Sequence, residues 1–194
     1  MARAVFLDRD GVVNELVYHQ ELEMIGTPFK VNQFKLLSGV PEAIKSLHQS
    51  GYLVILISNQ PDVAKGNMTL DTFEKIKQKM NAELAEAGAY LDGEYYCMHH
   101  PEAKVTKYRV DCDCRKPKSG MLLKATRDLN IDLHESWMVG DNLSDIQAGK
   151  DAGCRTVLIS KKKCELCSLM DERKIKPDNI SSDLTEAVNA ILKI

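Results

Sequence analysis

The sequence predicts an α/β fold: a three-layer, doubly wound and mostly parallel sheet with helices on both faces. Short apolar or β-branched runs alternate along the chain with longer segments of helical period, the pattern of parallel strands joined by helical crossovers. The chain has 194 residues, of which 44% are hydrophobic and 28% charged, so that a packed core can form. We expect a single domain over residues 1–194, without a large cap domain.

Each predicted element follows from its own pattern. The strands are near-continuously apolar, as expected when helices cover both faces of a sheet, and they span residues 4–7, 53–57, 138–139 and 156–159. The helices carry apolar residues at helical spacing between capping residues, and they span 41–49, 69 to about 88, 120–129, 145–152 and 184–192. Two stretches, 18–35 and 96–118, lack a clear period, and loops of that length are commonly functional.

Charge and composition exclude several classes of function. The formal net charge of −2 and the isoelectric point near 6.2 give no basic field for a nucleic acid. The longest purely apolar run, 53–57, is far shorter than the roughly 20 residues that span a bilayer, and the first residues lack the apolar core of a secretory signal. We therefore expect a cytoplasmic monomer without a nucleic-acid or membrane partner. In a reducing compartment, the six cysteines favour metal binding or plain burial.

Acidic and amide side chains follow three of the predicted strands. Asp8 and Asp10 come directly after the first strand, although a pair of this kind taken alone is more often a solvated turn. Ser58 and Asn59 follow the second strand, and Asp141 follows the third. Because ligands bind beyond the carboxyl ends of parallel strands, we expect these groups to converge on one ligand.

Three converging carboxylates repel one another unless a cation lies between them. Asp8, Asp10 and Asp141 offer the hard oxygen ligands that Mg²⁺ prefers. Lys116, which precedes Pro117 at the end of an irregular loop, adds a positive charge suited to a phosphate oxygen. A nucleophile, a metal, a cation and hydrogen-bond donors together indicate phosphoryl transfer.

A second group of candidate ligands lies in the 96–118 loop. Cys97, His99, Cys112 and Cys114 form the spacing Cys-x-His-x12-Cys-x-Cys, which supplies the four ligands of a structural Zn²⁺. The alternative is buried free cysteines beside a solvent-exposed histidine, and His100 is the second choice for the nitrogen ligand. Cys164 and Cys167 have no second pair to complete a site, so we interpret them as surface or packing residues.

Four motifs resemble, in order and approximate spacing, those of haloacid dehalogenase superfamily phosphatases. They are Asp8-x-Asp10-Gly11, Ser58-Asn59-Gln60, Lys116-Pro117 and Gly140-Asp141-x-x-x-Asp145. The resemblance covers almost the whole chain. It implies that Asp8 is the nucleophile, that Asp10 is the general acid and base, and that Mg²⁺ binds Asp8, Asp141 and the main-chain carbonyl of Asp10. Ser58, Asn59 and Lys116 would hold the transferred phosphoryl group, and Asp145 would assist the metal or orient Lys116.

The Cys/His loop and its Cys114-Arg115-Lys116-Pro117 run narrow the resemblance to a branch that holds heptose bisphosphate phosphatases and histidinol-phosphate phosphatases. The twelve-residue gap before Cys112 looks like that of the heptose enzymes. A sugar phosphate, with heptose 1,7-bisphosphate the leading candidate, is therefore the expected substrate, and Arg115 and Lys65 are candidates for contacting it beyond the reacting phosphate. A histidinol-phosphate phosphatase, another small-metabolite phosphatase and a non-catalytic zinc-stabilised interaction domain are the alternatives.

Two segments depart from the pattern of this branch. Pro61 and Asp62 stand where the heptose phosphatases more often have serine and glycine, and the 18–35 segment looks longer than theirs. Both segments are expected to line the substrate side of the site. The identity of the substrate therefore depends on these two segments.

Overall fold

The computed structural model describes residues 1–160, 170, 172 and 174–193. Its main sheet has six parallel strands in the order β5-β4-β1-β6-β7-β8. In chain order these are β1 (Arg3–Leu7), β4 (Tyr52–Asn59), β5 (Gly93–Cys97), β6 (Trp137–Gly140), β7 (Arg155–Ile159) and β8 (Asn179–Ser181). The doubly wound sheet predicted from the sequence is thus confirmed, with β5 and β8 as additional edge strands.

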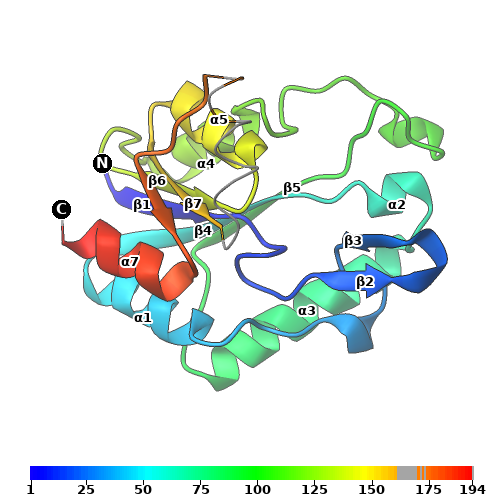
Figure 1. Cartoon of the computed structure of the whole chain (residues 1–194), viewed down its shortest axis with the longest axis horizontal. Coiled ribbons are helices and arrows are strands. Elements are labelled where there is room, and N and C mark those ends of the chain that lie inside the picture. Colours follow the sequence, from blue (N-terminus) through cyan, green and yellow to red (C-terminus); the bar gives the residue numbers. More distant parts are fainter. Residues whose placement is uncertain (161–169, 171, 173, 194) are drawn as a thin grey trace.

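Helices cover both faces of this sheet (Figure 1). One face carries α1 (Val40–Gln49), α3 (Leu70–Glu86) and α7 (Leu184–Leu192), and the other carries α4 (Gly120–Leu129) and α5 (Leu143–Ala152). Alternate residues of β1 face opposite ways: Val5 and Leu7 pack in the core with α1, α3 and α7, whereas Ala4 and Phe6 pack against α4. This burial on both faces explains why the central strands are apolar throughout.

Local sequence signals account for the ends of the helices. The Thr69 hydroxyl accepts a hydrogen bond from the Thr72 backbone N–H at the start of α3, and the Asp183 carboxylate accepts one from Glu186 at the start of α7. Across the described part of the chain, no helix has both the length and the apolar character that crossing a bilayer requires.

The segments without a clear sequence period contain short elements. An antiparallel hairpin of β2 (Val17–His19) and β3 (Met24–Gly26) forms most of the first segment, with single turns of 3-10 helix at Gln20–Leu22 and Val31–Gln33. The second segment begins in β5 and includes a 3-10 turn at Thr106–Tyr108. The one-turn helix α2 (Asp62–Lys65) follows β4.

The order of the strands determines where a ligand can bind. The chain runs from β1 outward to β4 and β5, and then returns to the other side of β1 to form β6, β7 and β8. A crevice forms at the carboxyl ends of the strands where the direction of winding changes, which here is the end of β1.

Candidate active site and metal centre

Two neighbouring strands and the helix that follows the second bring three carboxylates together. Asp8 directly follows β1, and its backbone N–H donates to the carbonyl of Val139 in β6 at 3.0 Å. Asp141 follows β6, and Gly11 allows it to approach, because a Cβ at Gly11 would collide with the Asp141 carboxylate. Carboxylate oxygens of Asp8, Asp141 and Asp145 all lie within 4.8 Å of one another.

The Lys116 ammonium lies among these carboxylates. Its Nζ is 2.8 Å from Asp8 Oδ1 and 2.6 Å from Asp145 Oδ1, and it donates to the Ile57 carbonyl at 2.8 Å. The Lys116 side chain is only 2% exposed. Asp145 is itself fixed, because its other oxygen accepts the Asn142 backbone N–H at the start of α5. Asp145 therefore orients Lys116, which is one of the two roles that the sequence resemblance implied.

The charges at this site are not balanced by protein groups alone. Burial raises the pKa of Asp8 to about 6, although the neighbouring Lys116 lowers it. Burial and the charges of Asp8 and Asp145 raise the pKa of Asp141 to about 7. Burial acts to lower the pKa of Lys116, but the carboxylates of Asp145 and Asp8 outweigh it and leave that pKa raised. One ammonium thus faces three carboxylates. The resulting excess of negative charge fits a bound divalent cation.

Asp10 is held by a separate network of donors. Its Oδ1 accepts from Arg9 Nη2 and from Asn14 Nδ2, both at 3.0 Å, and its Oδ2 accepts from Gln60 Nε2 at 2.6 Å. Arg9 Nη2 also donates to Gln60 Oε1 at 2.9 Å, so that the network is closed. All of these donors are buried. Asp10 is therefore fixed in one orientation close to Asp8.

Arg9 and Asn14 were not predicted from the sequence to have a role, and Gln60 was predicted only as part of a motif. The sequence did carry a signal for Arg9, because it lies between two acids directly after an apolar strand. In the structure Arg9 has no exposed surface. An arginine is almost never fully buried without a partner. The sequence alone offered no comparable signal for Asn14.

The two polar residues at the end of β4 have different surroundings. Ser58 is buried, and its hydroxyl accepts a hydrogen bond from Gln60 Nε2 at 3.0 Å. The Asn59 side chain pairs with the Lys116 backbone, donating to its carbonyl and accepting from its N–H, both at 3.0 Å. In this structure the Asn59 amide thus holds the segment that carries Lys116.

A cleft of about 400 Å³ opens over these groups. The hairpin contributes one wall of it, with Ile25, Gly26 and Thr27. The polar floor is formed by Asp8, Asp10, Asn59, Lys116, Asp141, Asn142, Ser144 and Asp145. A volume of this size is within the range of small-molecule sites.

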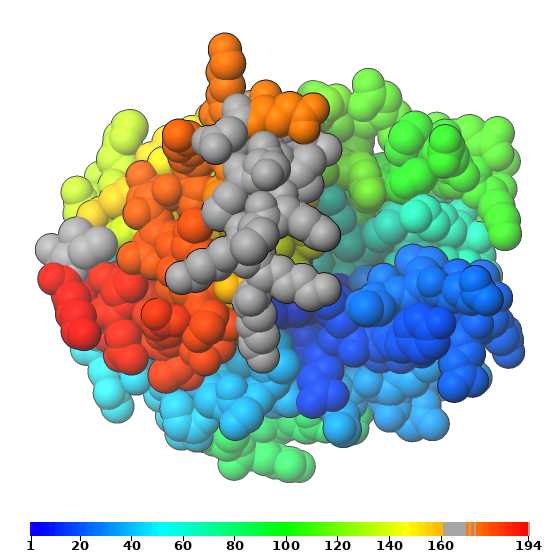
Figure 2. All heavy atoms as spheres, viewed as in Figure 1, coloured from blue at the N-terminus to red at the C-terminus, as the bar shows by residue number. Residues whose placement is uncertain are grey.

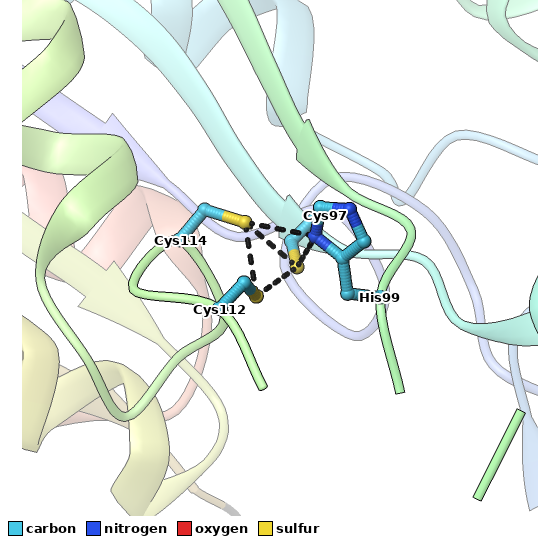
Figure 3. A group of neighbouring side chains, drawn as sticks. All are labelled: Cys97, His99, Cys112 and Cys114. Atoms are coloured by element: carbon cyan, nitrogen blue, oxygen red, sulfur yellow. Dashed lines mark hydrogen bonds between the residues drawn. The ribbon is translucent and has the colours of Figure 1, made fainter. Parts of the chain in front are cut away.

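Cys97, His99, Cys112 and Cys114 form the second cluster (Figure 3). The Sγ atom of Cys114 lies 3.2 Å from that of Cys97 and 3.2 Å from that of Cys112, and His99 Nδ1 is 3.3 Å from Cys114 Sγ. Burial raises the pKa of the Cys97 thiol. Three sulfurs and one imidazole nitrogen in this arrangement match the donor set of a closed tetrahedral zinc site.

The other residues considered for this region lie outside the cluster. His100 Nδ1 accepts the Glu102 backbone N–H at 3.1 Å, and His100 is not among the four clustered residues. Arg115 Nη1 donates to the His99 carbonyl at 3.2 Å. Burial and the nearby positive charges of Lys65 and Arg115 lower the pKa of His100. Cys164 and Cys167 lie outside the described residues.

The chain is similar to known proteins over most of its length. A family model described as HAD-hydrolase-like matches residues 113–187. The D-glycero-beta-D-manno-heptose-1,7-bisphosphate 7-phosphatase of Pasteurella multocida (strain Pm70) is 44% identical over 161 residues, 83% of each protein. The phosphatase of the same name from Photorhabdus laumondii is 37% identical over 98% of this chain and 97% of its own. The crystal structure of D,D-heptose 1,7-bisphosphate phosphatase from B. bronchiseptica, complexed with magnesium and phosphate, covers 98% of both chains with a TM-score of 0.78 at 29% identity.

Proposed function

The chain belongs to the haloacid dehalogenase superfamily, in the family of the D-glycero-beta-D-manno-heptose-1,7-bisphosphate 7-phosphatases, and we propose that it removes the 7-phosphate of heptose 1,7-bisphosphate in a Mg²⁺-dependent reaction. The observation that carries this proposal is the contact of Lys116 Nζ with Asp8 at 2.8 Å, on the floor of a cleft that Asp10 also lines. Family membership favours this enzyme over a non-catalytic zinc-stabilised interaction domain.

The reaction begins with attack of the Asp8 carboxylate on the terminal phosphorus. An Asp8–phosphorus bond forms as the bond from phosphorus to the sugar oxygen breaks, and Asp10 gives its proton to that oxygen. Asp10 then takes a proton from a water molecule, which attacks the aspartyl-phosphate and releases inorganic phosphate and free Asp8. Asp10 can serve both steps because its donors fix its orientation in the cleft that Asp8 also lines.

The remaining groups hold the phosphoryl oxygens. Lys116 offers its charge from the cleft floor, and Asp145 and the Ile57 carbonyl keep the ammonium there. Ser58 and Asn59, the polar residues that end β4, would hold the phosphoryl oxygens together with Lys116. Asp8, Asp141 and the main-chain carbonyl of Asp10 would hold Mg²⁺, which neutralises the negative charge of the transferred group when it is bound.

The Cys/His cluster would bind a structural Zn²⁺ through Cys97, His99, Cys112 and Cys114. The ion would brace the loop that leads into Lys116, and it would take no part in the reaction. The donor set of the cluster supports this role.

The far end of the substrate needs its own anion site. Arg115 directly precedes Lys116, and its guanidinium and the Lys65 ammonium both act on His100. These two cations would bind the second phosphate of a bisphosphate while the first lies over Asp8.

We propose that the protein performs this reaction as a single-domain cytoplasmic monomer in carbohydrate metabolism.

The decisive test is to trap a phosphoryl group on Asp8. Mass spectrometry after borohydride reduction of the protein during turnover should show homoserine at position 8, and the Asp8→Asn variant should show neither the product nor measurable phosphate release. Asp128→Asn, an exposed carboxylate on α4, serves as the control and should retain full activity. Turnover without modification at position 8 would contradict the mechanism.

The substrate is tested with heptose bisphosphate, its monophosphates, fructose bisphosphate and histidinol phosphate. Heptose bisphosphate should have the highest kcat/KM. Arg115→Ala should lower this kcat/KM by raising the activation free energy by about 1.5 to 3 kcal/mol, the usual contribution of a charged hydrogen bond. The kcat/KM for monophosphates should change much less. A preference for histidinol phosphate would overturn the substrate and leave the phosphatase chemistry unchanged.

A further inference from the structure

The two segments that depart from the family pattern contact each other in the structure. We call residues 17–27, which are the β2–β3 hairpin and the next residue Thr27, the flap. Thr27 Oγ1 donates a hydrogen bond to Asp62 Oδ2 at 3.1 Å, across 35 positions of sequence. In the space-filling view the flap, in dark blue, lies next to the teal and green surface that follows β4 (Figure 2). One feature unusual for the family thus holds the other.

The Thr27 hydroxyl and the Thr27 carbonyl both have hydrogen-bond partners. The Thr27 carbonyl lies 2.8 Å from His19 Nε2 at the other end of the hairpin, and the His19 ring stacks on Phe29 with 3.7 Å between ring centroids. His19 is buried. The contact with His19 therefore joins Thr27 to the rest of the flap, and the hydrogen bond to Asp62 joins Thr27 to the body of the protein.

Asp62 is well suited to hold the flap. It is 7% exposed, and its second oxygen accepts from Asn67 Nδ2 at 2.7 Å. The two carboxylate oxygens thus accept from two donors, Thr27 and Asn67. An asparagine at this position would lose the charge of the acceptor, and it could contact the Thr27 hydroxyl only as a donor from its N–H₂ group. Asp62 also begins α2, directly after the catalytic end of β4.

The helix α2 connects three parts of the structure. It continues from β4, it contacts the flap through Asp62, and its Ala64 carbonyl accepts the backbone N–H of Val105 in the Cys/His loop at 3.0 Å. The flap residues Ile25, Gly26 and Thr27 line the cleft above Asp8. A shift of Thr27 away from Asp62 would therefore move the wall that faces the part of the substrate beyond its reacting phosphate.

We propose that Asp62 is a positioning residue for substrate selection: through Thr27 it fixes the flap as the wall that contacts the sugar, without touching the reacting atoms. This inference rests on the proposed function, because the flap selects a ligand only if the phosphoryl group reacts at Asp8. It assigns to the Asp62–Thr27 pair the discrimination between a sugar bisphosphate and a small ester that does not reach the flap.

The test compares Asp62→Asn, Thr27→Val and the double variant in the full-length protein. Each single change should raise KM for heptose bisphosphate about 10- to 100-fold, the effect of one charge-assisted hydrogen bond, with kcat little changed. The double variant should be no worse than either single variant, because the two residues act through one bond. Thr27→Ser keeps the hydroxyl and should restore the KM of the wild type.

Two measurements separate positioning from a general loss of structure. The kcat/KM for p-nitrophenyl phosphate, which has no sugar for the flap to contact, should fall much less than that for heptose bisphosphate in Asp62→Asn. It should stay within about twofold of the wild type in the exposed control Asp71→Asn. Amide hydrogen exchange of residues 17–27 should become faster in Asp62→Asn and stay slow in the control.

The outcomes distinguish this inference from the function on which it rests. An unchanged KM, an equal loss on p-nitrophenyl phosphate, additive effects in the double variant or unchanged hydrogen exchange would each overturn the positioning role. Should the wild type release phosphate from no ester, the proposed function would fail instead, and hydrogen exchange would still decide whether Asp62 holds the flap.

Discussion

The carboxylate cluster and the Cys/His cluster are held together in different ways. Asp8, Asp141 and Asp145 come from the ends of adjacent strands and the first turn of a helix, and Lys116 provides an internal counter-charge. In the Cys/His cluster only Cys97 belongs to a strand, and the contacts that join the four residues are between the ligand atoms themselves. The protein thus builds the first cluster with its sheet, whereas the proposed Zn²⁺ would join the four residues of the second.

The two clusters are connected through Lys116. This residue belongs to the loop that the Cys/His cluster organises, yet its ammonium lies among the carboxylates. The Asn59 side chain fixes the Lys116 backbone from the side of the sheet. Perturbing the carboxylate cluster should therefore affect the reaction directly, and perturbing the Cys/His cluster should affect it through the position of Lys116.

Among changes that leave the nucleophile Asp8 in place, the largest effect is expected from Asp10→Asn, which keeps the shape of the side chain and removes the proton it transfers. Turnover of substrates with poor leaving groups should fall by about 10²- to 10⁴-fold, the usual contribution of general acid and base catalysis. Esters with good leaving groups should lose less in the first step, so that an aspartyl-phosphate accumulates. Burst kinetics with p-nitrophenyl phosphate measure this, and equal losses on both ester classes would mean that Asp10 is not the general acid.

Lys116→Met tests whether the first cluster depends on its internal counter-charge. The change leaves the carboxylates of Asp8 and Asp145 buried without their partner, which should lower the free energy of unfolding by about 3 to 5 kcal/mol. It should also reduce kcat by about 10²- to 10³-fold, because a preorganised charge at the phosphoryl group is lost.

The matched control for this change is Lys118→Met in the same loop. Lys118 is an exposed lysine whose pairs with Asp111 and Asp113 lie at the surface, so that its loss should cost at most about 1 kcal/mol. Urea denaturation and initial rates are to be measured on both variants. Equal stability of the two would show that the carboxylate cluster does not rely on Lys116.

Cys112→Ser is the corresponding test of the Cys/His cluster. The variant should lose most of the bound zinc, measured by elemental analysis, and its activity should fall by about 10- to 100-fold through displacement of Lys116. The sheet should remain folded, since Cys112 contributes to the loop. Cys154→Ser, at a buried cysteine outside the cluster, should retain zinc. A Cys112→Ser protein with full zinc content would point to other ligands.

The sequence predicted the central strands and the main helices because each carries a strong periodic signal over its whole length. Helix 120–129 and helix 184–192 have the predicted limits. The edge strand β5 was not predicted, since its Glu94 and two tyrosines are only half-buried and give neither an apolar run nor a clean alternation. The flap was not predicted for a related reason: Met24 and Ile25 are exposed, so that no buried face imposes a pattern.

Candidate site residues were predictable where backbone and chemistry agree locally. Asp8 and Asp10 adjoin an obvious strand, and the spacing from Cys97 to Cys114 indicates ligands without any knowledge of the fold. Contacts such as that of Thr27 with Asp62, or of Asn14 with Asp10, depend on how separate segments pack. Such contacts leave no mark in hydrophobic period or motif spacing, and they require the structure.

The smallest expected effect is on the pH dependence of stability, and it arises from the excess of negative charge in the carboxylate cluster. The folded protein raises the pKa of Asp8 to about 6 and that of Asp141 to about 7, both above the value of about 3.9 expected in the unfolded chain. The folded state therefore binds protons more tightly, and without a divalent cation its stability should fall as the pH rises from about 4 to 7. Mg²⁺ binds the deprotonated carboxylates and should reverse this loss.

The increase in Tm caused by Mg²⁺ should consequently be larger at pH 8 than at pH 5. At a Mg²⁺ concentration 100 times the Kd, the stabilisation of about 2.7 kcal/mol corresponds to an increase of about 5 to 10 °C for a protein of this size. At pH 5 protons compete for Asp8 and Asp141, and the increase should be a small part of that value. Comparing each pH with and without Mg²⁺ cancels the contributions of other titrating groups. Asp141→Asn should abolish most of the Mg²⁺ effect and leave bound zinc unchanged, whereas an equal Tm increase at both pH values would place the metal away from these carboxylates.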